Sequence, residues 1–213
     1  MIRDALQRDP ARLPRLADCT GVLVAGGRAE RLGGVAKGLL RVEGEPIVGR
    51  TLRLFGELFA DALVVANDPA PYLPFGVRIV PDIVPGKGAP GGLHAALAAA
   101  RTGWLFTAAC DMPFLAAGPI AWLAQRREGA RAVAVIWGGR LEPLHAFWSR
   151  GCLPTVERLV RDADPSMRQL ATAVGARLVT EAEWREVDPE GRAFVNVNTA
   201  GDAARLGIEA PRR

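Results

Sequence analysis

The sequence is nearly free of lysine: only Lys37 and Lys87 among its 27 basic residues are lysine, and all the others are arginine. The arginines are spread along all 213 residues, and the formal net charge is only +4. A protein that follows a phosphate backbone usually gathers its positive charge on one face or segment. We therefore expect no nucleic-acid partner. The scarcity of lysine is most simply a coding preference for arginine.

Long hydrophobic runs are also lacking. No apolar run approaches the roughly 20 residues that a membrane-spanning helix needs. The first 18 residues mix Asp with Arg and contain no apolar signal-peptide core. We therefore expect a cytoplasmic protein with no membrane partner.

Cysteine is scarce as well. Cys19, Cys110 and Cys152 are odd in number and far apart, and no two of them have the Cys-x-x-Cys spacing. This pattern argues against a disulfide framework and against a zinc site. All three are expected to be small residues of the core.

Hydrophobic residues, by contrast, make up 49% of the chain, which suffices for one large core at this length. We expect a single domain at residues 19–208, between an N-terminal tail at 1–18 and a C-terminal tail at 209–213. Five apolar runs with β-branched residues, each bounded by Gly, Pro, Asp or Asn, predict buried strands. These runs span residues 21–25, 62–66, 77–80, 104–109 and 132–137.

Apolar residues repeat at helical spacing between these runs, over residues 48–59 and 93–100. Strands that alternate with helices favour an α/β fold, here a Rossmann-like, mostly parallel (mixed) sheet that is flanked by helices. In such sheets ligands bind beyond the carboxyl ends of the strands. The chemistry is therefore expected in the segments that follow the apolar runs.

The segment after the first run is rich in glycine and basic residues. Glycine lets backbone N–H groups approach an anion closely, and Arg28 and Lys37 can add charged contacts to a polyphosphate. The spacing fits neither a P-loop nor a dinucleotide fingerprint, which argues against an NAD(P)-dependent oxidoreductase. The alternative is an ordinary strand-to-helix turn with solvated arginines. The segment reads Gly26-Gly27-Arg28-Ala29-Glu30-Arg31-Leu32-Gly33-Gly34.

Two later segments also follow strands. Gly91 and Gly92 precede a helix, whose free N–H groups and dipole favour an anion, although a flexible surface loop is the alternative. Asp111 follows the run 104–109. A carboxylate in this place can hold Mg²⁺ that bridges substrate phosphates, although it can also stabilise the bend at Pro113.

Asn196 and Asn198 alternate in the segment 194–199 near the C-terminus. On a short strand they would point the same way, and Thr199 would cap the last helix. Either Asn could supply a neutral oxygen to the same Mg²⁺ or a hydrogen bond to a second substrate. His145, in the strand-like run 142–148, could also face that second substrate.

Together these segments resemble the GT-A-type nucleotidyltransferases, and most closely the molybdenum cofactor guanylyltransferases of the MobA family. The glycine-rich signature and the Asp111 motif are shared by many nucleotidyltransferases, whereas the last motif points to this family. The matching residues follow in order from about residue 20 to residue 206: the signature from Val24 to Leu40, Glu45-Pro46, Gly91-Gly92-Leu93, Cys110-Asp111-Met112-Pro113, Glu142-Pro143-Leu144 and Phe194-Val195-Asn196-Val197-Asn198-Thr199.

The resemblance implies transfer of GMP from GTP to the phosphate of molybdopterin, with Mg²⁺ as cofactor and release of pyrophosphate. It makes Arg28, Lys37 and Asp111 the catalytic residues, with Asp111 as the metal ligand. Asn196 and Asn198 would lie on the pterin side or complete the metal shell. The positions that would contact the nucleotide are Val24, Ala25, Gly26, Gly27, Lys37, Asn67, Asp82, Gly91 and Gly92.

The resemblance also implies partners besides GTP and molybdopterin, namely other proteins of molybdenum cofactor biosynthesis and the molybdoenzymes that accept the product. Two other functions stay open. Molybdopterin cytidylyltransferases and sugar-phosphate nucleotidyltransferases share the signature and the Asp111 motif. Ala36 stands where the family usually has Asp, which leaves open a nucleotide-binding regulatory protein without catalysis.

Overall fold

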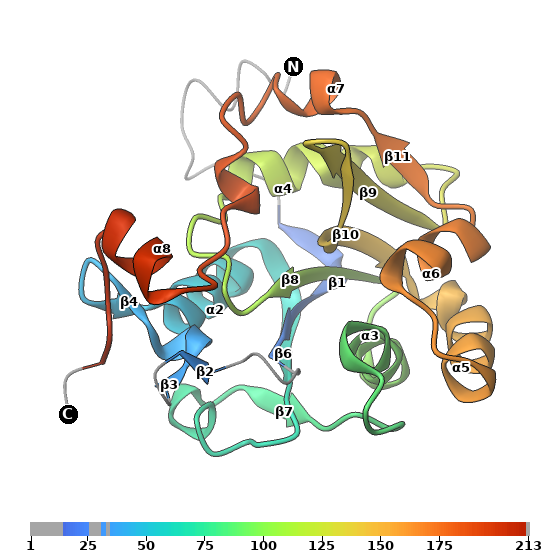
Figure 1. Cartoon of the computed structure of the whole chain (residues 1–213). Coiled ribbons are helices and arrows are strands. Elements are labelled where there is room, and N and C mark those ends of the chain that lie inside the picture. The colour runs from blue at the N-terminus through green and yellow to red at the C-terminus, as the bar shows by residue number, and fades with distance from the viewer. Residues whose placement is uncertain (1–14, 26–30, 33–34, 212–213) are drawn as a thin grey trace.

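A mixed sheet of seven strands forms the centre of the computed structural model, which describes residues 15–25, 31–32 and 35–211 (Figure 1). The strand order is β11-β9-β10-β8-β1-β6-β7. β10 is antiparallel to β8 and to β9, and the other neighbouring pairs are parallel. The predicted α/β class is therefore confirmed. The strands are β1 (Leu16–Val24), β6 (Phe59–Val65), β7 (Arg78–Val80), β8 (Trp104–Ala109), β9 (Ala132–Trp137), β10 (Arg140–Ser149) and β11 (Arg177–Val179).

β10 runs against its neighbours because β9 and β10 form a hairpin. Trp137 pairs with Arg140, and the two residues between them, Gly138 and Gly139, have positive φ angles of 55° and 72°. Two-residue loops of this kind match the twist of paired strands, and glycine adopts their left-handed backbone without strain. The first residues of β10 therefore lie at the same edge of the sheet as the carboxyl ends of the parallel strands.

Helices cover both faces of the sheet (Figure 1). One face carries α2 (Ile47–Leu58), α4 (Ala117–Ala124) and α7 (Glu181–Trp184). The other carries α3 (Gly88–Ala99), α5 (Leu153–Asp162) and α6 (Met167–Ala173). Aromatic rings fill the first face, where Phe106 lies 5.0 to 6.0 Å from three other Phe rings. The second face is packed mainly with Leu, Val and Ala.

A smaller unit lies beside the main sheet. Its strands β4 (Arg41–Val42), β5 (Glu45–Pro46) and β12 (Ile208–Glu209) pair with one another, and α8 (Ala200–Arg205) packs on them. Thr199 caps α8 in a reciprocal pair with Asp202, as predicted. β2 (Arg31–Leu32) and β3 (Val35–Ala36) form a separate pair. Single 3₁₀ turns occur at η2 (Lys37–Leu39), η3 (Leu73–Phe75), η4 (Gln125–Arg127), η5 (Arg150–Cys152) and η6 (Arg192–Phe194).

The prediction of a short strand at Asn196 and Asn198 is wrong. η6 ends at Phe194, and residues 195–198 form no strand. The side chain of Asp188 accepts hydrogen bonds from the backbone N–H groups of Arg192 and Ala193, which turns the chain at this point. Val197 then donates its N–H to the carbonyl oxygen of Asp111 at 3.0 Å instead of joining a sheet.

Two other expectations can be compared with the described part of the chain. All three cysteines are buried and none of them forms a disulfide bond, which confirms them as core residues. Within residues 15–25, 31–32 and 35–211, no helix is long and apolar enough to cross a membrane.

Candidate functional site

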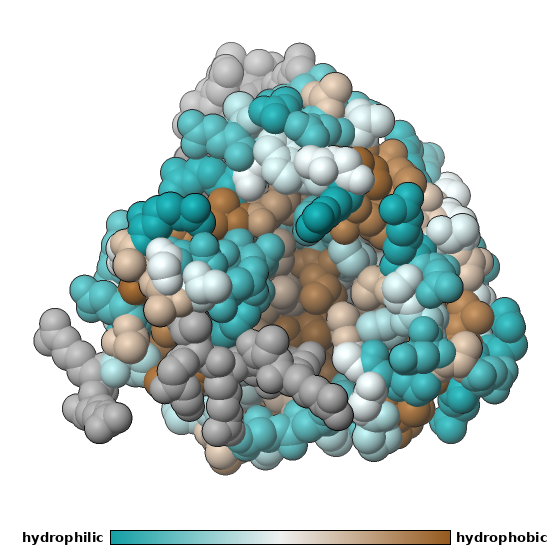
Figure 2. Space-filling model, viewed as in Figure 1, coloured by the Kyte–Doolittle hydropathy of each residue, from teal (hydrophilic) through white to brown (hydrophobic). Residues whose placement is uncertain are grey.

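A cavity of about 410 Å³ opens at the edge of the sheet where β1 and β8 end and β10 begins. Figure 2 shows a hollow near the centre of this face, with a mainly hydrophobic floor and a hydrophilic rim. The cavity brings together five residues that the sequence predicts for the site, although they are far apart along the chain. They are Val24, Lys37, Asp111, Asn196 and Asn198.

Lys37 lies at the centre of the polar part of this cavity. Its Nζ donates to Oδ1 of Asn198 at 2.7 Å and to Oδ2 of Asp111 at 3.2 Å. Lys37 is only 5% exposed. Charged hydrogen bonds of this kind are stronger than neutral ones, and removal of one partner from a buried ion pair is costly. The lysine is therefore held in one position by oxygens from two distant segments.

Backbone contacts fix the position of Asp111. The N–H of Cys110 donates to the carbonyl oxygen of Val24 at 3.2 Å, which ties the turn after β8 to the end of β1. The N–H of Val197 donates to the carbonyl oxygen of Asp111, and Val197 is fully buried. The C-terminal segment thereby docks on the turn and carries Asn198 to Lys37.

The oxygens of Asp111 and Asn198 converge on one cationic nitrogen. A carboxylate and an amide oxygen are hard ligands, which suit a cation such as Mg²⁺ that takes one or two carboxylates and completes its shell with water and phosphate. Among the described residues, no three His, Cys, Asp or Glu side chains gather as a metal cluster. The donor set therefore suits a metal that substrate phosphates help to hold, and does not suit structural zinc.

Asn67 and Asp82 pair with each other beyond the ends of β6 and β7. Asn67 Nδ2 donates to Oδ2 of Asp82, and its Oδ1 accepts from the backbone N–H of Asp82, each at 2.9 Å. The other carboxylate oxygen of Asp82, Oδ1, is buried and accepts no hydrogen bond from the described part of the chain. A buried acceptor without a donor is costly, so Asp82 offers a binding position for an N–H or O–H group.

Gly91 and Gly92 lie in the first turns of α3, which begins at Gly88, earlier than predicted. A Cβ at residue 92 would come within 2.9 Å of Cγ1 of Val24 and 4.0 Å of Oδ1 of Asp82. Glycine at this position therefore lets the start of α3 pack directly on the end of β1, next to the free oxygen of Asp82.

Four other predicted contact residues do not line the cavity in the described part of the chain or lie outside that part. Gly26, Gly27 and Arg28 lie outside the described residues. Ala25 is fully buried, and its N–H donates to the carbonyl oxygen of Val65 at 2.8 Å. The side chain of Ala25 therefore belongs to the core.

Sequence reasoning gave no role to Glu142, which also lines the cavity. Burial raises the pKa of its carboxyl to about 7, and Arg140 opposes this only in part. The pairing of β10 with β9 shifts register between Glu142 and Phe147. Pro143 lacks an N–H for the ladder, and irregular strands of this kind often direct a side chain into a site. The pair Gly138-Gly139 is the sequence signal that could have placed Glu142 here, because it predicts the hairpin.

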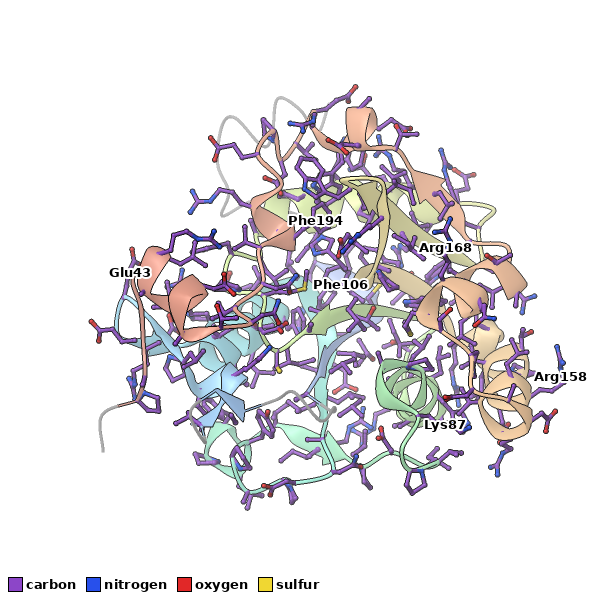
Figure 3. All side chains as sticks on the ribbon, in the orientation of Figure 1. Glu43, Lys87, Phe106, Arg158, Arg168 and Phe194 are labelled. Carbon is purple, nitrogen blue, oxygen red and sulfur yellow. The ribbon has the colours of Figure 1, made fainter. Side chains whose placement is uncertain are left out.

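His145 does not face a substrate, contrary to the expectation from its position. It is fully buried, and its ring lies 5.0 to 5.3 Å from the rings of Phe106, Trp184 and Phe194. Phe106 and Phe194 are labelled in Figure 3. This surrounding lowers the pKa of His145 to about 3, because burial disfavours the charged ring. His145 is therefore a neutral core residue.

Lys87 likewise does not reach the cavity. Its Nζ donates to the carbonyl oxygen of Ala163 at 2.6 Å and lies 3.8 Å from Asp164, just beyond the end of α5. Figure 3 shows Lys87 beside α3 on the side of α5. A cation is favourable at the C-terminal end of a helix. The contacts of Lys87 therefore join two helices and do not involve the phosphate-binding position proposed for Lys37.

Comparison with known proteins agrees with this architecture. A molybdenum cofactor guanylyltransferase of Cupriavidus metallidurans is 33% identical over 192 residues, which cover 85% of this chain and 91% of the relative. A probable molybdenum cofactor guanylyltransferase of Pelotomaculum thermopropionicum is 32% identical over 195 residues, which cover 92% of this chain and 95% of the relative.

The fold is shared with solved structures. Molybdopterin-guanine dinucleotide biosynthesis protein A of Archaeoglobus fulgidus superposes with a TM-score of 0.74 at 23% identity, over 88% of this chain and 96% of that one. The 2-C-methyl-D-erythritol 4-phosphate cytidylyltransferase of Thermus thermophilus superposes with a TM-score of 0.61 at 18% identity, over 87% and 95%. The family model of the MobA-like NTP transferase domain matches residues 21–179. The chain therefore belongs to the family of MobA-like nucleotidyltransferases.

Proposed function

We propose that this chain transfers GMP from GTP to the phosphate of molybdopterin and releases pyrophosphate. The observation that carries the proposal is the buried contact of Lys37 with Asp111 and Asn198 inside one cavity. The names of these two relatives support the choice of substrates. The cavity has room for reacting phosphates at the point where all three side chains meet.

The reaction needs no protein nucleophile. A phosphate oxygen of molybdopterin attacks the α-phosphorus of GTP in line, and the new P–O bond forms as the bond to the bridging oxygen of the β-phosphate breaks. Pyrophosphate leaves with the electron pair. Lys37 stabilises the negative charge that moves onto the leaving group, and it does so effectively because water is largely excluded around it. Arg28 would add a second positive charge.

Asp111 is the residue that we propose to hold Mg²⁺. Its Oδ2 and the Oδ1 of Asn198 already converge on a cation, the ammonium of Lys37. When bound, Mg²⁺ would neutralise charge on the substrate phosphates. Asn196 lines the same cavity and would complete the shell or bind the second substrate.

The nucleotide would lie on the side of β6 and β7. Oδ1 of Asp82 is a buried acceptor without a donor among the described residues, and guanine presents two N–H donors on one edge. The residues that would surround it are Val24, Ala25, Gly26, Gly27, Asn67 and, at the start of α3, Gly91 and Gly92. These contacts would select guanine because adenine lacks this pair of donors.

Pyrophosphate release tests the proposal directly. The full chain is mixed with molybdopterin, Mg²⁺ and either GTP, CTP, ATP or UTP. The rate with GTP is expected to exceed the rate with each other nucleotide by at least about tenfold, because the loss of one hydrogen bond to a charged group corresponds to a change of about this size. A clear preference for CTP would indicate a cytidylyltransferase instead. Tight nucleotide binding without turnover on any nucleotide would indicate a regulatory protein, consistent with Ala36.

A further inference from the structure

Glu142 is the second carboxylate of the cavity. Among the described residues that line it, only Asp111 and Glu142 are acidic. Asp111 is already engaged by Lys37, whereas Glu142 has no hydrogen bond or ion pair with the rest of the described chain. A half-buried carboxylate without a partner destabilises the fold unless a ligand supplies donors. Burial raises its pKa to about 7, and the charge of Arg140 lowers it only in part.

The order of the strands separates Glu142 from the nucleotide side. Asp82 follows β7 at one end of the sheet, and β6, β1 and β8 lie between β7 and β10, which carries Glu142. Asp111 lies between these two ends, at the turn after β8, where it accepts a hydrogen bond from Lys37. A nucleotide that reaches from Asp82 to Asp111 therefore leaves the side of Glu142 to the second substrate.

The surroundings of Glu142 suit a flat ring with a polar edge. Pro143, Leu144 and Met167 form apolar lining of the same cavity. Such lining can pack against the faces of a ring, while the carboxylate accepts hydrogen bonds from its edge. An ionised carboxylate has two acceptor oxygens and no donor, so it prefers an edge with two neighbouring N–H groups.

We propose that Glu142 recognises the pterin ring of the second substrate by accepting hydrogen bonds from the 2-amino group and the adjacent ring N–H of its 2-amino-4-oxo edge. This proposal rests on the proposed guanylyltransferase function. Guanine has the same donor edge, and the strand order is the reason to assign the pterin to Glu142 and the guanine to Asp82. Glu142 is thus a specificity-determining residue, separate from the phosphate chemistry at Lys37 and Asp111.

Steady-state kinetics of Glu142→Gln test this assignment. Glutamine keeps the size of the side chain but replaces one acceptor by an NH₂ group, which would face an N–H of the pterin. At saturating GTP, we expect the KM for molybdopterin to rise about 10- to 100-fold, the range for loss of a hydrogen bond to a charged group. The KM for GTP and kcat should stay within about twofold. Asp82→Asn is the matched variant, and it should raise the KM for GTP while leaving that for molybdopterin unchanged.

Equilibrium binding of molybdopterin, measured with Mg²⁺ and an α,β-methylene analogue of GTP whose α–β bridge cannot be cleaved, gives a second measurement that does not depend on turnover. Glu142→Gln should weaken this binding by the same factor as the KM. An unchanged molybdopterin affinity in a folded variant would overturn the proposal, as would a rise confined to the KM for GTP or a fall confined to kcat. A wild-type protein that fails to use molybdopterin at all would instead overturn the proposed function.

Discussion

The regions around Lys37 and Lys87 show how one residue type takes two roles in the same molecule. Lys37 is 5% exposed and donates to Asp111 and Asn198, which lie 74 and 161 residues further along the chain. Lys87 donates to a backbone carbonyl oxygen at Ala163, near the surface. Both lysines precede a glycine and follow a strand in sequence. Their difference arises from the segments that the fold brings to each ammonium.

This comparison teaches that the partner oxygens, more than the local motif, decide what a lysine does. The oxygens around Lys37 belong to side chains that open into a cavity, so a ligand can share them. The carbonyl oxygen at Ala163 belongs to the end of a helix, where the cation satisfies the helix itself. Lys37 is therefore placed to interact with a ligand in the cavity, whereas Lys87 stabilises the end of a helix.

Asp111→Asn should have the largest effect on the Lys37 region. The amide cannot supply the negative charge that holds Mg²⁺ and pairs with Lys37, so kcat for pyrophosphate release should fall by at least about 10³-fold. Chelation of Mg²⁺ should abolish wild-type turnover in the same assay. Far-UV circular dichroism checks that the variant is folded. Turnover within tenfold of wild type would remove Asp111 from the reaction.

Lys37→Arg and Lys87→Arg form a matched pair that tests the comparison itself. Both substitutions keep the charge, but a planar guanidinium does not fit a position shaped for a compact ammonium. We expect kcat to fall about 100-fold for Lys37→Arg. For Lys87→Arg kcat should stay within about twofold, because the helix end needs only a cation. Equal effects on kcat would show that the two regions do not differ in function.

Gly92→Ala should perturb the start of α3, near Lys87. The new Cβ would lie 2.9 Å from Val24, so the helix must shift or the valine must move, which costs about 1–3 kcal/mol of folding free energy. Gly103→Ala is the control, since no atom lies within 4 Å of its added Cβ. Urea unfolding measures both. A Gly92→Ala variant as stable as wild type would mean that α3 is free to move at this end.

Glu142→Gln should change stability in a way that depends on pH. Burial raises the pKa of this carboxyl from 4.5 to about 7, so the folded state binds the proton more tightly than the unfolded state. Wild-type stability is therefore lost as the pH rises from about 4.5 to 7. The variant should be more stable than wild type at pH 8, by roughly 1 kcal/mol after allowance for solvent screening, with a smaller advantage at pH 5. The pH dependence of the melting temperature checks this, and parallel curves would contradict it.

Much of the fold was predictable because buried parallel strands leave a clear mark in sequence. The runs at 104–109 and 132–137 match β8 and β9 residue for residue. The run at 21–25 identified only the buried end of β1, whose first residues are more exposed and alternate less clearly. β11 was not predicted, because it has only three residues and two of them are exposed, which is too short for a recognisable hydrophobic pattern.

Site residues that directly follow a strand, such as Asp111, were predictable from the sequence. Residues whose position depends on contacts between distant segments of the chain were not. The prediction placed Asn196 and Asn198 near the site but gave them the wrong backbone, since the hydrogen bonds at Asp188 that turn this segment depend on the fold. Glu142 was given no role because its approach to the cavity depends on the direction of β10. His145 was misread because alternation along a strand does not show that aromatic rings from η6 and α7 close over it.

The hairpin of β9 and β10 makes one continuous stretch of chain, residues 132–149, responsible for one wall of the cavity. Most of the other polar groups of the cavity come from different parts of the sequence. Exchange of this one stretch between relatives would thus alter that wall while leaving Lys37 and Asp111 in place. Replacement of residues 132–149 alone would therefore be a way to change which second substrate the cavity accepts.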